Sequence, residues 1–541
     1  MENVLILAAG EFNPKNVSAG MIADASLIPI RGKPAIGWII DSVKKNGAKN
    51  IKIALREDNT QLSRILTCVY PDVEQVFLNN SVDITISLYK LLVSSNDDAP
   101  TQIVLGDTFI DEAFPKEPDV FLSSPKVKTS TQWCLVSKDK NGYIENIYNK
   151  EPDIPLNGKE VLVGYYKFSD TKLLKQIVKD VIDSNVLDFS EILRRYNQKI
   201  PVLIKNTNHW YDFGHISGAV QARLGLYNAR EFNNLVVDSV RGTITKKSKK
   251  KQKLLDEANW YQSLPLELAC FAPRVFNVTE NADDASIEME LYGYQNLAEI
   301  FLYGSNNLED WYNIIESLLK VHKLFEKYTD KADKQELIEI YQNKTNLRIQ
   351  DIEQKNSAIY QMMQDEYITI NNVRYKNYPV IKNDLNNAIL KLVEFDKRTI
   401  VHGDYCFSNI LFDPMCYIFK FIDPRGRFKT QTIYGDPRYD IAKLRHSVVG
   451  LYDFIVAGLY KLSIDGKNYH FQISTPLLTE QLELFFDKLV MEYGYNCKDI
   501  KLIEGLLFLT MIPLHSDDIN RQKAFYLTAI KKINEVLYDE Q

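Results

Sequence analysis

Three polar side chains in the second half of the chain have the types and the spacing needed to act on a phosphate group. Asp404 ends the run His-Gly-Asp, Asn409 stands five residues later, and Asp423 follows the apolar stretch 418–422. In this layout Asp404 would accept the proton of an attacking hydroxyl, while Asn409 and Asp423 would hold the Mg²⁺ ions on ATP. Each residue alone is explained as well by a polar loop. The ordered set, rather than any one member, predicts a kinase active site.

The residues around this set differ from those of protein kinases. Gly403 stands where protein kinases have an arginine, and Asp423 is followed by Pro-Arg-Gly rather than Phe-Gly. Together with Asp-Pro-Arg-Tyr-Asp-Ile-Ala-Lys at 436–443, these motifs resemble the aminoglycoside phosphotransferase and choline kinase family of small-molecule kinases. The resemblance implies ATP as the phosphate donor, Mg²⁺ as the cofactor and a small-molecule acceptor.

A kinase fold also needs an upstream lysine on a strand and a glutamate on a helix, because the lysine contacts the α- and β-phosphates and the glutamate orients it. Residues 242–246 alternate like a strand, and residues 253–261 have helical periodicity. We therefore expect Lys246 and Glu257 to form this pair. Glu290 belongs to a run that resembles the hinge whose backbone contacts adenine, although an apolar strand with polar ends explains that run nearly as well.

A lysine cluster surrounds this strand and permits other readings. Lys249, Lys250 and Lys251 are explained by a solvated basic run or by a patch for nucleic acid. The formal net charge of the chain is −6, which argues against a polyanionic partner. We therefore expect a solvated run and no nucleic-acid partner.

The N-terminal half opens with small residues after an apolar strand. Ala8, Ala9 and Gly10 would let the backbone approach a nucleotide closely. Strand-like and helix-like segments then alternate, which favours a doubly wound, mostly parallel α/β sheet with ligands at the carboxyl ends of its strands. Asp107 stands at one such end, and Asp212 follows much later. We expect these two carboxylates to share one Mg²⁺ at the α-phosphate of an NTP.

These positions resemble a nucleotidyltransferase family that joins an NTP to a phosphorylated small molecule and releases pyrophosphate. The motifs are the Leu-Ala-Ala-Gly opening, Gly-Lys-Pro at 32–34, Gly-Asp at 106–107 and Trp-Tyr-Asp-Phe-Gly at 210–214. The resemblance implies that Lys150 binds the acceptor phosphate. The segments around Ser87 and 131–136 are closer to phosphocholine cytidylyltransferases than to hexose enzymes. We therefore expect Ser87 at the nucleotide site and CTP as the nucleotide, with UTP or GTP as alternatives.

The opening loop departs from this family. Members usually continue with a Gly, a Thr or Ser and an Arg, and later carry Pro-Lys before the Gly-Lys-Pro step. Here residues 10–15 read Gly-Glu-Phe-Asn-Pro-Lys, and residues 24–25 read Asp-Ala. Lys15, Arg31 or Lys33 must then hold the phosphates, or the site binds an NTP weakly.

Composition is consistent with two or three soluble domains. The 541 residues suffice for a nucleotidyltransferase domain at 1–232 and a two-lobed α+β kinase domain at 233–541, whose N-lobe spans about 233–295 and C-lobe about 296–541. No segment approaches the ~20 apolar residues that cross a membrane, and the N-terminus lacks the features of a signal peptide. The six cysteines lack metal-ligand spacing. These features predict a cytoplasmic protein without a membrane partner.

The two halves together predict a bifunctional enzyme. A kinase makes a phosphate ester of a small alcohol, amino alcohol or sugar, and a nucleotidyltransferase consumes such an ester. The resemblance implies products used for bacterial surface or capsule polysaccharide synthesis. One alternative is a kinase whose N-terminal domain binds a nucleotide or sugar without catalysis. Another is a binding module that has lost both activities, which the set Asp404, Asn409 and Asp423 argues against.

Overall fold

The computed structural model describes residues 2–10, 22, 24–79, 83–126, 129–214, 233–355, 357–476 and 478–538. Its contacts divide the chain into two compact units, Met1–Leu226 and Tyr227–Gln541. The division at 226/227 falls within residues 215–232, and the expected boundary at 232/233 is at their end. These residues lie outside the described part of the chain, as does Lys15.

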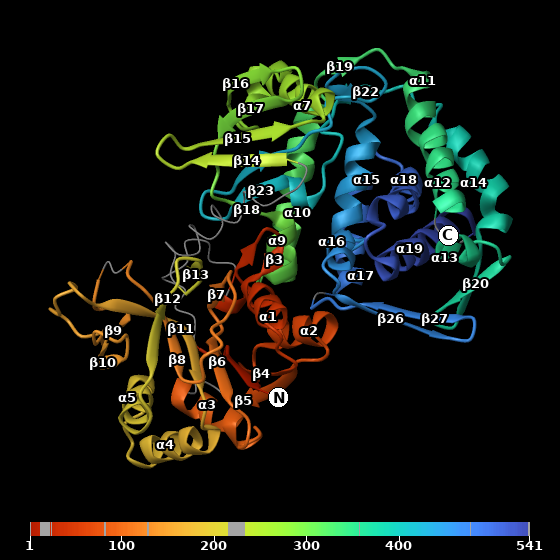
Figure 1. Ribbon diagram of the computed structural model, residues 1–541. Coiled ribbons are helices and arrows are strands. Elements are labelled where there is room, and N and C mark those ends of the chain that lie inside the picture. Colours follow the sequence, from red (N-terminus) through yellow and green to blue (C-terminus); the bar gives the residue numbers. More distant parts are fainter. Residues whose placement is uncertain are drawn as a thin grey trace. The chain divides into compact units, whose positions relative to one another are not determined.

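The first unit is built on one mixed sheet (Figure 1). Within the described residues this sheet has nine strands, of which seven follow the order β10-β9-β11-β6-β1-β4-β5, while β8 pairs with β11 and β12. The pairs β1–β4, β1–β6, β4–β5 and β8–β12 are parallel, and antiparallel pairs of β11 extend the sheet on one side. The strands are β1 (Asn3–Leu7), β4 (Asn50–Arg56), β5 (Glu74–Leu78), β6 (Thr101–Leu105), β8 (Val120–Ser124), β9 (Cys134–Lys138), β10 (Ile144–Asn149), β11 (Glu160–Phe168) and β12 (Leu203–Asn206).

Helices cover this sheet. Every residue of β1 is buried, so neither face of that strand meets solvent. On α4, Leu174, Ile177, Val178 and Val181 are buried, and this spacing forms a single apolar stripe. That stripe joins β1, α3 and α5 in one apolar core. The expected doubly wound α/β class with a parallel sheet is confirmed. The helices are α1 (Ala35–Lys45), α2 (Thr60–Val69), α3 (Ile84–Val93), α4 (Thr171–Asp183) and α5 (Phe189–Lys199).

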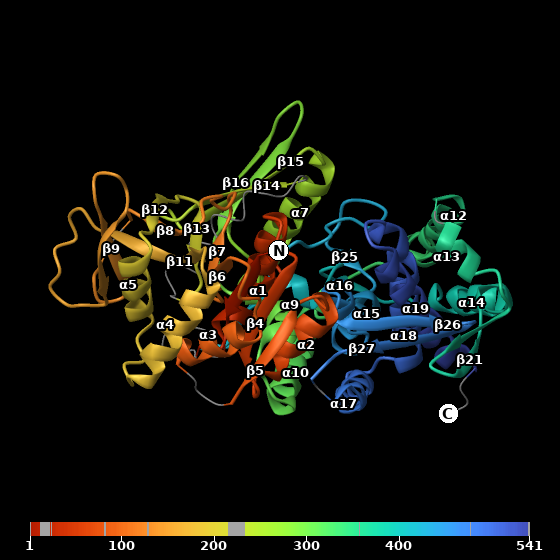
Figure 2. The ribbon, with the colours of Figure 1, turned by 60° about the horizontal axis from the view of Figure 1, so that its bottom comes forward.

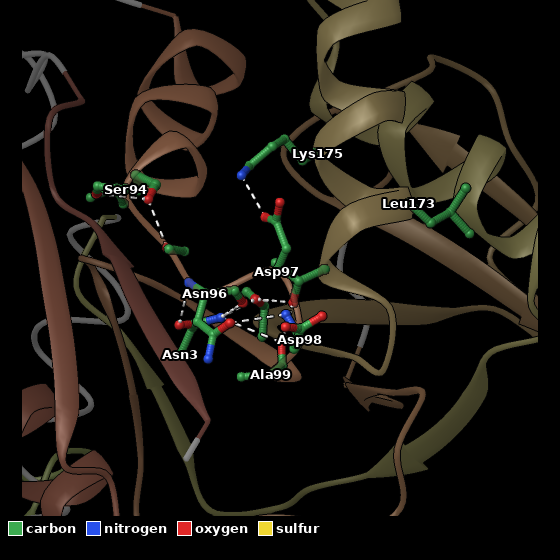
Figure 3. Close-up of polar contacts among 12 residues, drawn as sticks. Asn3, Ser94, Asn96, Asp97, Asp98, Ala99, Leu173 and Lys175 are labelled. Carbon is green, nitrogen blue, oxygen red and sulfur yellow. Dashed lines mark hydrogen bonds and ion pairs between the residues drawn. The ribbon is translucent and has the colours of Figure 1, made fainter.

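A buried asparagine fixes the amino ends of the central strands (Figure 3). The Asn3 side chain is fully buried and donates to the carbonyl of Asn96 at 2.9 Å, while its oxygen accepts from the Asn96 backbone N–H at 3.2 Å. Lys175 of α4 pairs with Asp97 at 2.5 Å in the same loop. These contacts tie the start of β1 to the loop between α3 and β6. Because β1 and β6 are parallel, their carboxyl ends lie at the same edge of the sheet.

The second unit begins with an antiparallel sheet of order β14-β15-β17-β16, and α7 packs against it (Figure 1). The strand and helix expected around Lys246 and Glu257 are present as β15 and α7. The bounds are β14 (Asn233–Asp238), β15 (Thr243–Ser248), α7 (Lys251–Ser263), α8 (Leu266–Ala269), β16 (Val275–Glu280) and β17 (Ala285–Glu290).

A larger, mainly helical lobe follows, centred on α15, α18 and α19 (Figure 2). Nine consecutive residues of α18, 502–510, are buried, and Ile500 is buried as well, because neighbouring helices surround α18. The helices are α9 (Leu297–Tyr303), α10 (Leu308–Phe325), α11 (Lys334–Leu337), α12 (Lys344–Lys355), α13 (Ser357–Met362), α14 (Tyr378–Leu392), α15 (Pro437–Val448), α16 (Tyr452–Val456), α17 (Thr479–Glu492), α18 (Cys497–Met511) and α19 (Ile519–Tyr538). A π-helical turn, Ile338–Asn343, joins α11 to α12.

Short strands complete this lobe. The ladder β18-β23-β24 and the ladder β19-β22-β25 flank the segment 401–409, and β21-β20-β27-β26 forms a separate sheet. No helix among the described ranges is both long and apolar enough to cross a bilayer. The strands are β18 (Gln295–Asn296), β19 (Thr329–Asp330), β20 (Tyr367–Ile370), β21 (Val373–Lys376), β22 (Arg398–Ile400), β23 (Ile410–Asp413), β24 (Ile418–Phe421), β25 (Tyr434–Gly435), β26 (Tyr460–Asp465) and β27 (Asn468–Ile473).

Candidate active sites

Two carboxylates of the first unit face the same small space. Asp107 follows β6, and Asp212 ends β13 (Trp210–Asp212), which pairs with β7 (Thr108–Ile110) so that Asp212 stands opposite Thr108. A Cβ atom added to Gly214 would lie 2.5 Å from Asp107 Oδ2 and 3.3 Å from Asp212 Oδ1. Residues expected to share a metal are therefore neighbours, although more than a hundred positions separate them in the sequence.

The small residues after β1 lie against the same strand end. The N–H of Gly106 donates to the Leu7 carbonyl at 2.8 Å, and a Cβ atom added to Gly106 would lie 2.7 Å from Ala8 Cα. No side chain fits at position 106 without moving the backbone. Ala8 and Ala9 are buried, and Gly10 is exposed at the edge of the sheet.

Three other predicted side chains of this unit have their own contacts. Lys33, on β3 (Lys33–Pro34), pairs with Asp41 of α1 and lies 5.0 Å from the centre of the Trp38 ring. Ser87 is buried on α3, and its hydroxyl donates to the carbonyl of Asp83 at 3.1 Å. Lys150 is exposed, with a φ of 52°. Their roles in binding stay predictions.

Arg56 is a further basic residue of this site, and it lies in none of the sequence motifs. This residue ends β4, and its Nη1 donates to the Gly10 carbonyl at 2.9 Å while its Nε pairs with Asp58 at 3.0 Å. Arg56 reaches Gly10 because β4 pairs with β1 in parallel, so that the carboxyl ends of the two strands are neighbours. This pairing register is not visible in a single sequence. It supplies a positive charge next to the opening loop, where the usual arginine and lysine are absent from the sequence.

In the second unit, Lys246 of β15 lies between two carboxylates. Its Nζ is 2.7 Å from Glu257 Oε2 and 2.5 Å from Asp423 Oδ1. Lys246 and Glu257 are buried, and the two carboxylates hold the pKa of Lys246 above its usual value against the opposing effect of burial. Burial raises the pKa of Glu257, and the charge of Lys246 opposes that rise. The sequence predicted the pair of Lys246 with Glu257. The structure adds Asp423, the predicted metal ligand, as a second partner of Lys246.

Asp404 lies at the centre of a second polar group. Its carboxylate accepts a hydrogen bond from Asn409 Nδ2 at 2.9 Å and pairs with Lys443 Nζ at 2.8 Å. Burial favours the protonated acid, but the charge of Lys443 and the hydrogen bond from Asn409 hold the pKa of Asp404 below its usual value. Asp423 is near enough for its own ionisation to be opposed by the charge of Asp404. The arrangement keeps Asp404 ionised and fixed in orientation.

Asp440 of α15 holds the backbone next to Asp404 by hydrogen bonds. Asp440 is fully buried and accepts from the N–H groups of His402 at 2.6 Å and Gly403 at 2.8 Å. Gly403 has a φ of 77°, and a Cβ atom there would lie 2.7 Å from Arg425 Cβ, so glycine is required. This explains why the loop has glycine where protein kinases have arginine.

The segment after Asp423 packs directly on α7. Arg427 Nε lies 2.5 Å from Asp256 Oδ2, and its Nη2 donates to Asp256 Oδ1 at 3.0 Å. Gly426 has a φ of 60°, and an added Cβ atom would lie 2.0 Å from the Asp256 carbonyl oxygen. Because Asp256 adjoins Glu257, the same contact holds both the helix glutamate and the metal acid in place.

Glu290 stands at the end of β17. Its Oε2 accepts from the Arg274 N–H at 3.1 Å and from the Tyr292 hydroxyl at 2.7 Å, and its backbone N–H donates to the Arg274 carbonyl at 3.0 Å. The side chain therefore braces the end of the strand. Contact of this segment with adenine stays a prediction.

The predicted metal sites of the two units both suit Mg²⁺. The described residues contain no cluster of three or more histidine, cysteine or acidic side chains that could hold a metal ion. Mg²⁺ commonly uses one or two carboxylates and takes its other ligands from substrate phosphates and water. Asp107 with Asp212, and Asp423 with Asn409, provide such partial oxygen sets. The donor chemistry fits the predicted cofactor at each place.

Comparisons with known proteins give two groups of similar solved structures. CTP:phosphocholine cytidylyltransferase from Streptococcus pneumoniae is 14% identical and covers 42% of this chain and 99% of its own, with a TM-score of 0.34. The inositol-1-phosphate CTP transferase from T. maritima is 14% identical and covers 40% and 91%, with a TM-score of 0.33. A thermostable mutant of aminoglycoside phosphotransferase APH(4)-Ia, in complex with AMP-PNP and hygromycin B, is 13% identical and covers 56% and 90%, with a TM-score of 0.33.

These groups agree with the two resemblances carried by the motifs. No protein-family model matches the chain, and no curated protein matches it.

Proposed function

We propose that this chain is a bifunctional transferase, whose second unit phosphorylates a small molecule with ATP and whose first unit transfers a nucleotidyl group to the phosphorylated product. The observation that carries the kinase proposal is the ion pair of Lys246 with Glu257 at 2.7 Å, joined by Asp423 at 2.5 Å. In kinases the strand lysine, the helix glutamate and the metal acid must be in place together before phosphoryl transfer occurs.

In the kinase half, Lys246 binds the α- and β-phosphates, and Glu257 keeps its ammonium pointed at them. Asp404, ionised beside Lys443, orients the acceptor hydroxyl and accepts its proton. Asn409 and Asp423 would hold Mg²⁺, which neutralises the charge that develops on the transferred phosphoryl group. The reaction gives ADP and a phosphate ester.

The nucleotidyltransferase proposal is supported by the meeting of Asp107 and Asp212 beside the close-packed backbone of Ala8 and Gly106. Together the two carboxylates would hold Mg²⁺, which neutralises the triphosphate. Lys150 would bind the phosphate of the acceptor. We propose CTP as the nucleotide, UTP or GTP as alternatives, and activated precursors of surface polysaccharides as products made in the cytoplasm.

A second candidate keeps the kinase and gives the first unit a binding role only. It is favoured by one observation: Lys33, a substitute for the missing phosphate-binding residues, is engaged with Asp41. In that case the first unit would bind an NTP or a sugar and release no pyrophosphate.

The experiment uses the full chain and measures two products separately. ADP release is followed with ATP, Mg²⁺ and a panel of alcohols, amino alcohols, sugars and their acid derivatives. Pyrophosphate release is followed with CTP, UTP or GTP and the phosphate esters of the same compounds. Asp404→Asn should abolish ADP release while leaving Mg·AMP-PNP binding nearly unchanged, since this acid acts on the hydroxyl. Near-normal turnover of Asp404→Asn would contradict the kinase assignment.

Complementation of two inactive variants tests the order of the two steps. Asp404→Asn should keep pyrophosphate release from the phosphate ester, and Asp107→Ala should keep ADP release. A mixture of both variants should convert the free acceptor to the nucleotide-activated product, because the ester made by one diffuses to the other. If every ester of a compound phosphorylated by the kinase leaves pyrophosphate release at background, the second candidate replaces the transferase.

A further inference from the structure

A pocket of about 540 Å³ opens in the second unit beside the proposed phosphoryl-transfer site. One wall is formed by the π-helical turn Ile338–Asn343 and by α12, and the other by the segment after Asp423. π-Helical turns are rare and occur often at functional sites. The charged and aromatic residues that line the pocket are Glu339, Lys344, Arg348, Asp351, Arg425 and Phe428.

Arg425 connects this pocket to Asp404. Its backbone N–H donates to the His402 carbonyl at 2.9 Å, and a Cβ atom added to Gly403 would lie 2.7 Å from Arg425 Cβ. The side chain of Arg425 therefore starts against the residue that precedes Asp404. On the opposite wall, Lys344 Nζ donates to the hydroxyl of Tyr439 at 3.3 Å. Tyr439 lies one helical turn before Lys443, the partner of Asp404.

The pocket carries an excess of positive charge. Of its acids, Asp351 pairs with Lys355 at 2.8 Å and with Arg348 at 3.5 Å. Among the residues that the structure describes, neither Lys344 nor Arg425 forms an ion pair with a carboxylate. Instead, the Arg425 guanidinium lies 4.8 Å from the centre of the Phe428 ring.

The other acid in the wall, Glu339, accepts a hydrogen bond from Asn343 at 2.7 Å. It therefore has a local partner on its own helical turn. The two cations nearest the transfer site remain available to a ligand.

The same positive charges act on the pKa of Tyr439. Burial opposes ionisation of this phenol, yet the charges of Lys344, Lys443 and Arg425 lower its pKa below the usual value. Tyr439 favours the charged form of Lys344, but burial and the positive charges of Arg425 and Lys443 outweigh it and lower the pKa of Lys344. A bound anion would relieve this repulsion.

We propose that the pocket binds the acceptor of the kinase half and that this acceptor carries an anionic group, a carboxylate or a phosphate, held by Arg425 and Lys344. The inference rests on the proposed kinase function. Arg425 offers the planar donor pair that matches either anion. With the anion bound there, the acceptor hydroxyl lies toward Asp404. Its oxygen bonds to the γ-phosphorus of ATP, the bond to the bridging oxygen breaks, ADP leaves, and the hydroxyl proton passes to Asp404.

A preference for an anionic acceptor would distinguish this chain from kinases that phosphorylate positively charged amino alcohols. Two cations in a half-buried pocket repel an ammonium group and leave it without a counter-ion, which is costly in a partly desolvated site. Acceptors that share a carbon frame and differ only in charge should therefore be strongly discriminated.

The test compares such acceptors on the full chain with Mg·AMP-PNP bound. Thermal unfolding and calorimetric titration are measured with D-glycerate, glycerol 3-phosphate, glycerol and 2-aminopropane-1,3-diol, and with gluconate, glucitol and 1-amino-1-deoxyglucitol. At least one carboxylate or phosphate compound should bind about tenfold or more tightly than its neutral and amino counterparts. Preference for glycerate over glycerol 3-phosphate, or the reverse, identifies the anion.

Variants separate this inference from the kinase proposal. Arg425→Met or Lys344→Met should weaken binding of the preferred anion by about 10- to 100-fold and leave Mg·AMP-PNP binding unchanged. Arg425→Glu should shift the preference toward the amino compound. Lys488→Met is the control, because this lysine of α17 is exposed and neither it nor its partner Glu492 lines the pocket.

Two failures have different meanings. If wild-type protein does not bind Mg·AMP-PNP, the kinase proposal itself is wrong. If it binds the nucleotide but prefers the neutral or amino compounds, or binds none of the anions, the anionic acceptor is refuted and the kinase proposal stands.

Discussion

Replacing Lys443 by methionine should move the acid limit of the kinase reaction to higher pH. Lys443 Nζ lies 2.8 Å from Asp404 Oδ1, and its charge helps to hold the pKa of that acid below the usual value. Asp404 must be ionised to accept a proton. Loss of Lys443 raises its pKa, so protonation begins at higher pH and activity is lost there.

The size of this shift follows from the contact. A hydrogen bond to a charged group is worth about 1.5–3 kcal/mol, and about 1.4 kcal/mol corresponds to one pKa unit. The lost contact alone would raise the pKa of Asp404 by about one to two units. Because 40% of the Asp404 side chain is exposed, solvent screening reduces the effect, and we expect about one unit.

The assay is the pH profile of kcat/KM for ADP release, from about pH 4 to about pH 8, because kcat/KM reports the ionisation of the free enzyme. Lys443→Arg is the control, since it keeps the charge, and thermal unfolding of each variant checks the fold. If Lys443→Met leaves the acid limb where it is in wild-type protein, Lys443 does not set the ionisation of Asp404.

Three further predictions address other parts of the molecule. Gly426→Ala should lower the free energy of unfolding, measured by chemical denaturation, by about 2 kcal/mol or more, because its φ is 60° and a Cβ would overlap the backbone of α7. Gly466→Ala is the control: its φ is 59°, but open space surrounds it, so the free energy of unfolding should fall distinctly less. Lys246→Ala and Glu257→Gln should lower ATP turnover non-additively in a double-mutant cycle, and additive losses would mean that the two residues act independently. Asp107→Ala should remove pyrophosphate release and leave ADP release intact. If the variant still releases pyrophosphate, Asp107 is not a metal ligand.

Local sequence determined much of the fold. The strand and helix around Lys246 and Glu257 have clear periodicity, and they occur as β15 and α7. The parallel core of the first unit followed from alternating strands and helices. Antiparallel β9, β10 and β11, and the sheet formed by β20, β21, β26 and β27, depend on pairings between distant segments, which periodicity does not specify.

The candidate sites divide in the same way. Motif residues such as Asp404 and Asn409 were identifiable because their spacing is short and ordered. Arg56 beside Gly10, and Arg425 with Lys344 in the pocket, were not, because only packing brings them together. Lys443 stood within a recognised motif, yet its contact with Asp404 required the orientation of α15.

The Arg427–Asp256 contact bears on how the kinase half could be controlled. Many kinases are switched by an activation segment that orders or disorders and thereby moves the helix glutamate. Here a buried carboxylate, a bidentate arginine and a glycine in direct contact with the helix backbone fix that segment by packing. We expect the enzyme to be constitutively assembled, with its rate governed by the supply of acceptor and nucleotide rather than by covalent modification of this segment.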